Sequence, residues 1–146
     1  MSSNLQVLDL EVLVPNPTLS PGKGMANSLP MLRMHLEDGS EFVMAGIPLD
    51  TATAILRRLH NQSNPDSRHS CHDVICEISQ VISTTVDCIV PKSSAFAATT
   101  RLKVEGFTND LKFQMIPSQA VLLALTADAP IYVSRELIEL QKRHGE

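Results

Sequence analysis

The stretch LRMHLEDGSEFVMA, residues 32–45, predicts a β-hairpin. In its first half, apolar Leu32, Met34 and Leu36 alternate with polar residues, as in a strand that buries one face. Asp38-Gly39 favours a type I′ turn, which needs φ > 0 at both central residues. The returning strand covers residues 41–45. We therefore expect an antiparallel pair of strands whose apolar face points into the protein.

Further elements flank the hairpin. Residues 5–14 alternate like a strand, and the loop 15–28, which is rich in proline and glycine, is expected to be flexible. After the hairpin come two helices, one beginning after Pro48 and one after a capping box of Ser70 and Asp73. The apolar face of the strand is Leu8, Leu10, Val12 and Val14. That of the first helix is Leu49, Ala52, Leu56 and Leu59. That of the second helix is Val74, Ile75, Ile78, Val81 and Ile82.

The rest of the chain predicts strands over 84–90, 96–104, 111–115 and 131–133. A helix over 117–127, with Ser118 as its N-cap, precedes the last strand, and an amphipathic helix starts at Ser134. Strands joined by short turns pair antiparallel, and these helices do not alternate regularly with strands. We therefore predict the α+β class: a mostly antiparallel sheet with helices packed against it. The whole chain, residues 1–146, is expected to be one compact domain with a tail at 142–146.

Composition narrows the class of protein. With 43% hydrophobic and 19% charged residues, a chain of 146 residues can bury a real core. Three irregularly spaced cysteines indicate free thiols, and neither a secretory leader nor a membrane-spanning apolar run is seen, so we expect a cytoplasmic protein with no membrane partner. A net charge of −4 with four Phe, one Tyr and no Trp disfavours non-specific nucleic-acid binding.

Chemistry could reside where the second helix begins. His69, Cys71, His72 and Cys76 lie there, but only His72 and Cys76 converge at i, i+4, and a zinc site needs three or four ligands. His72-Asp73 can also be a general base beside a carboxylate. Adjacent residues on a helix point about 100° apart, so Asp73 is better explained as a capping residue. For His72 both interpretations stay open.

Other polar residues give weaker signals. Ser118 lies in no GxSxG motif, and the sequence contains no glycine-rich phosphate loop. The carboxylates have no spacing that forces a magnesium site, and the basic residues form a patch only if the fold gathers them; solvated charges explain both sets better. The carboxylates are Asp50, Asp87, Asp110 and Asp128, and the basic residues are Arg57, Arg58, Arg101, Lys103 and Lys112.

Near the C-terminus, IPSQAVLLAL (116–125) followed by APIYV (129–133) resembles the signature of the bifunctional nuclease domain family, approximately RPSDAxxLAL, a short gap and APIYV. The order of elements agrees as well, including a His-Asp pair, here His72-Asp73, that opens a helix. The resemblance covers about residues 5–141. It implies a small α+β domain that self-associates and acts as a nuclease on DNA and RNA. It leaves room for a divalent metal such as magnesium or manganese.

The chain departs from that signature at charged positions. The signature's Arg and Asp are Ile116 and Gln119 here, and an acidic position falls near Asp50 or Thr51. The matching polar residues, and hence the candidate catalytic residues, are His72, Asp73, Ser118 and Gln119.

Two functions compete. One is the nuclease that the family implies, and convergence of the four candidates in one cleft would favour it. The other is a non-catalytic homo-oligomeric module that binds a small ligand or a protein and has lost the family's charged residues. A third, an accessory role within a larger complex, has no sequence feature that tests it.

Overall fold

The structure is a computed structural model that describes residues 4–14, 29–62, 68–90 and 95–144. Within these ranges the elements follow the order βββααβββαβα, as the sequence predicts. The expected loop over 15–28 lies outside the described residues. The strands are β1 (Asn4–Leu13), β2 (Met31–Leu36), β3 (Glu41–Met44), β4 (Gln80–Val90), β5 (Ala95–Lys103), β6 (Leu111–Met115) and β7 (Ile131–Ser134).

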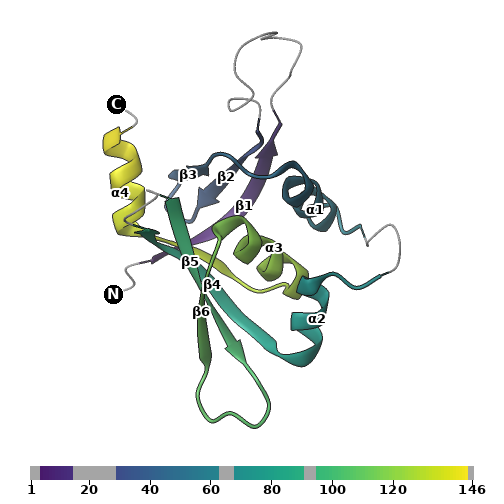
Figure 1. The fold of residues 1–146 in the computed structure, drawn as a ribbon. Helices are drawn as coiled ribbons and strands as arrows, with labels where there is room; N and C mark the ends of the chain where they lie inside the picture. Colours follow the sequence, from purple (N-terminus) through teal and green to yellow (C-terminus); the bar gives the residue numbers. More distant parts are fainter. Residues whose placement is uncertain (1–3, 15–28, 63–67, 91–94, 145–146) are drawn as a thin grey trace.

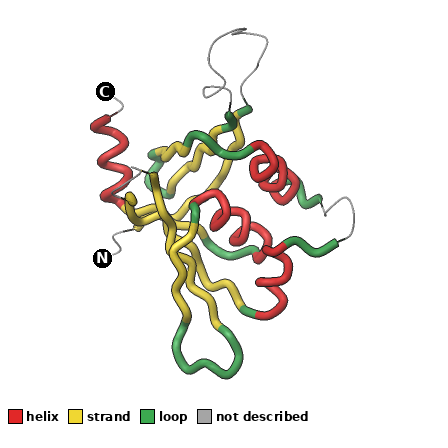
Figure 2. The backbone as a smooth tube through the Cα atoms, in the orientation of Figure 1, coloured by secondary structure: helices red, strands yellow, loops and turns green. Residues whose placement is uncertain are grey.

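These strands form one sheet in the order β3-β2-β1-β7-β4-β5-β6 (Figure 1). Neighbouring strands are antiparallel, except that β4 and β7 are parallel. The helices are α1 (Leu49–Leu59), α2 (Cys71–Ile78), α3 (Pro117–Ala127) and α4 (Arg135–His144), so part of the expected tail at 142–146 is helical. In Figure 2, α1, α2 and α3 lie together on one side of the strands, whereas α4 lies apart from them and follows directly after β7. The prediction of an α+β fold with a mostly antiparallel sheet is confirmed.

The β2–β3 hairpin has the predicted inward face but a different turn. Leu32 is paired with Met44 and Met34 with Phe42, and all four are buried. Only Gly39 has positive φ, at +88°. Gly39 N donates to Leu36 O and Leu36 N to Ser40 O, each at 2.9 Å, which is the pattern of a type I turn followed by a G1 bulge. The type I′ expectation was therefore wrong.

A β-bulge in β1 changes which residues face the core. The pairing with β2 shifts between Val7 and Asp9. Leu5 is buried and Val7 packs on the core before the bulge, whereas Leu10 and Val12 do so after it. One inserted residue reverses the inward parity of a strand. Leu8, expected on the inward face, is consequently 66% exposed.

Helix α3 is the central element of the helical layer. It packs on β4 and β5, with α1 and α2 on either side of it (Figure 1). Its N-cap is Ile116 and Pro117 occupies the first turn, so Ser118 is not the N-cap. The helix ends at Asp128 in the left-handed conformation. Ala129 N donates to Ala124 O at 2.8 Å, as in a Schellman motif.

Helices α1 and α2 bury fewer side chains than the apolar faces in their sequences suggest. In α1 the buried residues include Ala52 and Ile55, whereas Leu49 is 61% exposed. Helix α2 ends at Ile78 and buries no residue fully. The expected continuation through Val81 and Ile82 was wrong, because these residues begin the β-branched run of β4. α2 therefore lies at the margin of the helical layer rather than over the sheet.

The sheet curls so that its two ends share one core. Phe42 of edge strand β3 meets Phe96 of β5 edge-to-face, with ring centroids 5.1 Å apart. Helix α4 packs on β7, β3 and β4 and contributes buried Leu137 and Ile138. Gln141 of α4 accepts a hydrogen bond from Val43 N at 2.8 Å and donates to Val43 O at 2.7 Å, which pairs backbone groups of β3. No helix in the described part of the chain is long and apolar enough to cross a membrane.

Candidate functional site

The N-terminus of α2 is fixed by a complete capping box. Ser70 Oγ accepts from Asp73 N at 3.1 Å, and Asp73 Oδ2 accepts from Ser70 N at 2.8 Å. These bonds satisfy backbone donors that the first turn of a helix leaves free. Ser70 Oγ also lies 3.0 Å from the same carboxylate oxygen. The predicted capping role of Asp73 is therefore present in the structure.

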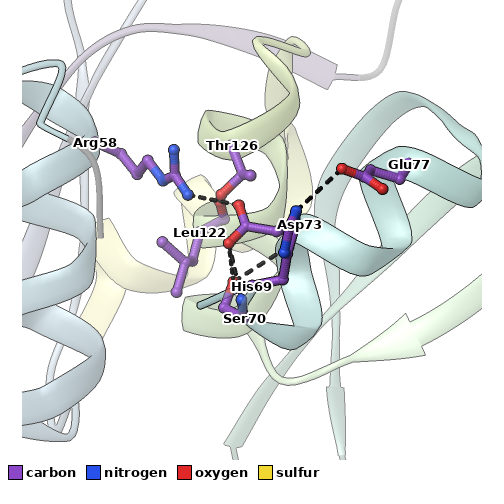
Figure 3. Close-up of polar contacts among 7 residues, drawn as sticks. All are labelled: Arg58, His69, Ser70, Asp73, Glu77, Leu122 and Thr126. Atoms are coloured by element: carbon purple, nitrogen blue, oxygen red, sulfur yellow. Dashed lines mark hydrogen bonds and ion pairs between the residues drawn. The ribbon is translucent and has the colours of Figure 1, made fainter. Parts of the chain in front are cut away.

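The carboxylate of Asp73 also joins two helices. Its Oδ1 accepts from Arg58 Nη2 of α1 at 2.7 Å (Figure 3). The two side chains are 24% and 18% exposed, so the ion pair is partly shielded from water. Arg58 comes from the last turn of α1, where a cation is favourable for the helix dipole. Asp73 thus has a structural partner on each carboxylate oxygen.

His72 points to a different neighbour. It is half-buried and is hydrogen-bonded to Gln119 in the first turn of α3. Gln119 Nε2 in turn donates to Thr51 Oγ1 of α1 at 3.1 Å. Thr51 is buried, whereas Asp50 is exposed and accepts a bond from Thr51 N at 2.8 Å. The chain of contacts Thr51–Gln119–His72 therefore connects α1, α3 and α2.

The surroundings of His72 favour its neutral form. Burial lowers the pKa of His72 below its ordinary value, while its bonds to Gln119 and the nearby Asp73 act in the opposite direction without cancelling the effect. Gln119 Nε2 keeps a second hydrogen beside the one that it donates to Thr51, and Gln119 Oε1 is an acceptor, so the amide is able to bond either ring nitrogen of a neutral imidazole. In its neutral form an imidazole has one N–H donor and one nitrogen with a lone pair.

The structure thus brings together only part of the predicted set. His72 and Gln119 meet, and Asp73 is adjacent but directed at Arg58 and Ser70. Ser118 is 3% exposed in the first turn of α3. Sequence reasoning did not identify Thr51 as a member of the site or Arg58 as the partner of Asp73. The signal for Thr51 was the family's acidic position near residues 50–51.

The residues do not fit a divalent metal. Magnesium and manganese need several oxygen ligands, usually including free carboxylates. Around His72 the oxygens belong to Thr51 and Gln119, which are neutral, and Asp73 is engaged by Arg58. No three His, Cys, Asp or Glu side chains group together among the residues that the structure describes.

Cysteine chemistry gains no support beside His72. Burial raises the pKa of the Cys76 thiol, and Asp73 raises it further, so this thiol stays protonated at neutral pH. His69 is exposed, and its Nε2 lies 3.2 Å from Glu77 Oε1 (Figure 3). The cluster His69, Cys71, His72 and Cys76 is therefore not a joint ligand set.

The other charged candidates are dispersed over the molecule. Asp128 caps α3, Asp110 pairs with Arg101 at 2.6 Å, and Asp87 lies on the sheet face opposite the helical layer. The basic residues lie in two groups on different elements. Arg57 and Arg58 belong to α1, whereas Arg101, Lys103 and Lys112 lie on β5 and β6. Of these, Arg58 is near enough to His72 to help lower its pKa.

The sequence matches the family model of the bifunctional nuclease domain over residues 33–144. The match includes α1, α2 and α3, which carry Thr51, Arg58, His72, Asp73 and Gln119, whereas β1 lies outside it. No curated protein matches the chain.

Proposed function

Because the chain belongs to the bifunctional nuclease domain family, we propose that it is a nuclease that hydrolyses phosphodiester bonds of DNA or RNA. The environment of His72 supports this proposal most directly. Burial lowers the pKa of its half-buried imidazole, which favours the neutral form at pH 7, and the ring is hydrogen-bonded to Gln119. A general base needs that protonation state and a fixed orientation.

In the proposed reaction, His72 takes a proton from the attacking water as the new P–O bond forms. The bond from phosphorus to the leaving oxygen breaks, and that oxygen receives a proton from the imidazolium or from solvent. Gln119 positions His72, and Thr51 positions Gln119. Arg58, held by Asp73 within the same helical layer, adds positive potential toward the phosphate. Asp73 is a positioning residue, since its carboxylate contacts Ser70 and Arg58.

The test is cleavage of RNA, single-stranded DNA and duplex DNA by the purified chain, with magnesium, manganese or a chelator. We expect His72→Ala to lower the rate of cleavage at least about a hundredfold, as the loss of a general base does. The matched control is His69→Ala. The His69 side chain is 62% exposed and contacts Glu77, so this variant should keep the wild-type rate. Cleavage that survives His72→Ala would contradict the proposed base.

A different observation supports the second candidate function, a non-catalytic module. Thr51 and Gln119 are hydrogen-bonded to each other where α1, α2 and α3 meet, and both side chains are neutral. The family's signature has an acid at position 119 and another near 50–51. Ile116, in place of the signature's Arg, is 68% exposed. A non-catalytic module would show no cleavage by the wild type. Cleavage gained with Gln119→Asp and Ile116→Arg together would then identify the lost charges as the cause.

We also propose that the chain self-associates through β6. The β3 edge is covered at Val43 by Gln141, whereas β6 is the opposite edge of the sheet. Phe113 on β6 is 49% exposed and Ile116 directly after the strand is 68% exposed. In the β2–β3 hairpin, Met34 and Met44 are buried, whereas Met31 is 37% exposed. Light scattering after size exclusion should show a homo-oligomer that Phe113→Asp converts to monomer; a monomeric wild type would refute it.

A further inference from the structure

A cavity lies on the face of the sheet that α3 does not cover. Its volume is about 370 Å³, and its floor includes Thr85 of β4 and Thr99 of β5, which are paired in register. The neighbouring residues Thr84 and Thr100 are fully buried on the helical side. Because side chains alternate along a strand, Thr85 and Thr99 must point to the opposite face. This outer cavity is therefore separated from His72 by the sheet and α3.

Positive charge is concentrated at one side of the outer cavity. Arg101 of β5 and Lys112 of β6 both line it and are paired directly across the strands. Like charges in that position repel each other. Asp110 offsets Arg101 through a contact of 2.6 Å to Nη2, but a guanidinium has further N–H donors. Lys112 makes no ion pair within the described part of the chain. The pair therefore offers an uncompensated charge to an anion.

The opposite side of the outer cavity carries acceptors. Asp87 of β4 and Glu136 at the start of α4 line it, together with the hydroxyls of Thr85 and Thr99. A carboxylate accepts hydrogen bonds from hydroxyl groups and repels phosphate. A ligand that satisfies both sides has one anionic end and a neutral end with hydroxyls. A nucleic-acid strand would instead bring its next phosphates against the acids.

We propose that the outer cavity binds a small phosphomonoester whose organic part carries hydroxyl groups, such as a nucleoside monophosphate or a sugar phosphate. Lys112 and Arg101 hold the phosphate through charge-assisted hydrogen bonds. Asp87 and the two threonines hold the sugar hydroxyls. A volume of about 370 Å³ is at the small end of the range for ligand cavities, which suits a molecule of this size. The site is independent of the proposed nuclease activity.

The test is a titration of the isotope-labelled full chain, followed by amide shifts in NMR spectra. The probes are adenosine monophosphate, ribose 5-phosphate, adenosine, inorganic phosphate and a short single-stranded oligonucleotide. Both phosphomonoesters should shift the amides of Thr85, Thr99 and Lys112 saturably, and the tighter of the two shows which organic part the cavity prefers. Adenosine should not bind, and inorganic phosphate should bind more weakly than either ester.

Lys112→Gln should weaken binding of the preferred ester about tenfold, as expected for loss of one charge-assisted contact. The matched control is Lys103→Gln. Lys103 is exposed on the same face of β5 as Arg101 but does not line the outer cavity, so its loss should leave affinity unchanged. Any of four results would overturn the proposal: equal weakening of ester binding by both variants, no saturable shift, phosphate binding as tightly as the esters, or tighter binding of the oligonucleotide through Lys112. None of these readouts depends on His72.

Discussion

Replacing Asp73 with alanine should destabilise the fold by about 2 kcal/mol. The change removes the acceptor of Ser70 N, which is worth about 1 kcal/mol for a helix cap. It also removes the partner of Arg58. Because the two side chains are 24% and 18% exposed, we assign this pair about 1 kcal/mol, at the upper end of the range for surface pairs. For a chain of 146 residues, the midpoint of thermal unfolding should fall by roughly 6 °C.

The measurement is urea and thermal unfolding of the wild type, Asp73→Ala, Arg58→Ala and the double variant. The double-mutant cycle should give a coupling free energy of about 1 kcal/mol between Arg58 and Asp73. Ser70→Ala, which removes the other half of the capping box, should cost about 1 kcal/mol and should not affect that coupling.

Nuclease assays of the same variants separate a structural from a catalytic role. Well below its unfolding midpoint, Asp73→Ala should keep its cleavage rate within about tenfold of the wild type, because Asp73 acts on rate only through positioning. The reasoning would be refuted by unchanged stability together with a loss of cleavage as large as that of His72→Ala. In that case Asp73 would act on the substrate or on His72 rather than on the helix.

Three further predictions concern the site and the core. The lowered pKa of His72 means that the unfolded chain binds more protons than the folded chain. The stability that His72 contributes is therefore fully present above about pH 6.5 and is lost as the pH falls from there through the folded-state pKa. Between pH 7.5 and 5, urea unfolding should show a smaller loss of unfolding free energy for His72→Asn than for the wild type. Gln119→Glu places a carboxylate against the imidazole and should raise the pKa of His72 by about one unit or more in an NMR titration; a fall would contradict the assigned contact. Phe42→Ala should cost about 3–5 kcal/mol of unfolding free energy, because Phe42 is 0% exposed and meets Phe96, whereas Phe107→Ala at a 57% exposed position should change it by less than about 1 kcal/mol.

Local patterns were sufficient to predict most elements, and they failed where one residue changes the register. The capping box at Ser70 and the inward face of Leu32, Met34 and Leu36 follow from short-range rules. The bulge after Val7 does not, because its cause is the pairing of β1 with β2 rather than any glycine or proline signal. The same holds for the end of α2, where helical periodicity continues through Val81 although the β-branched run belongs to β4.

Some members of the site were predictable, but Thr51 and the contacts between the members were not. His72 and Gln119 were candidates from the family signature, and Asp73 was assigned to the cap from its spacing to Ser70. The bonds Gln119–Thr51 and Arg58–Asp73 span 68 and 15 residues of sequence. Such contacts depend on how α1 and α2 sit on either side of α3, which no local pattern specifies.

The position of β7 has a consequence for how the chain is synthesised and folded. Strands β1–β3 and β4–β6 each form an antiparallel group with mainly short-range pairing, and β7 joins the groups by pairing with β1 and β4. On a ribosome, both groups emerge before residues 131–134 do. Until then β1 and β4 each present an unpaired edge, and the joining step must close a loop of nearly the whole chain. We therefore expect the nascent chain to be most prone to aggregation just before β7 is released, and the closing of the sheet to be the slowest step of folding.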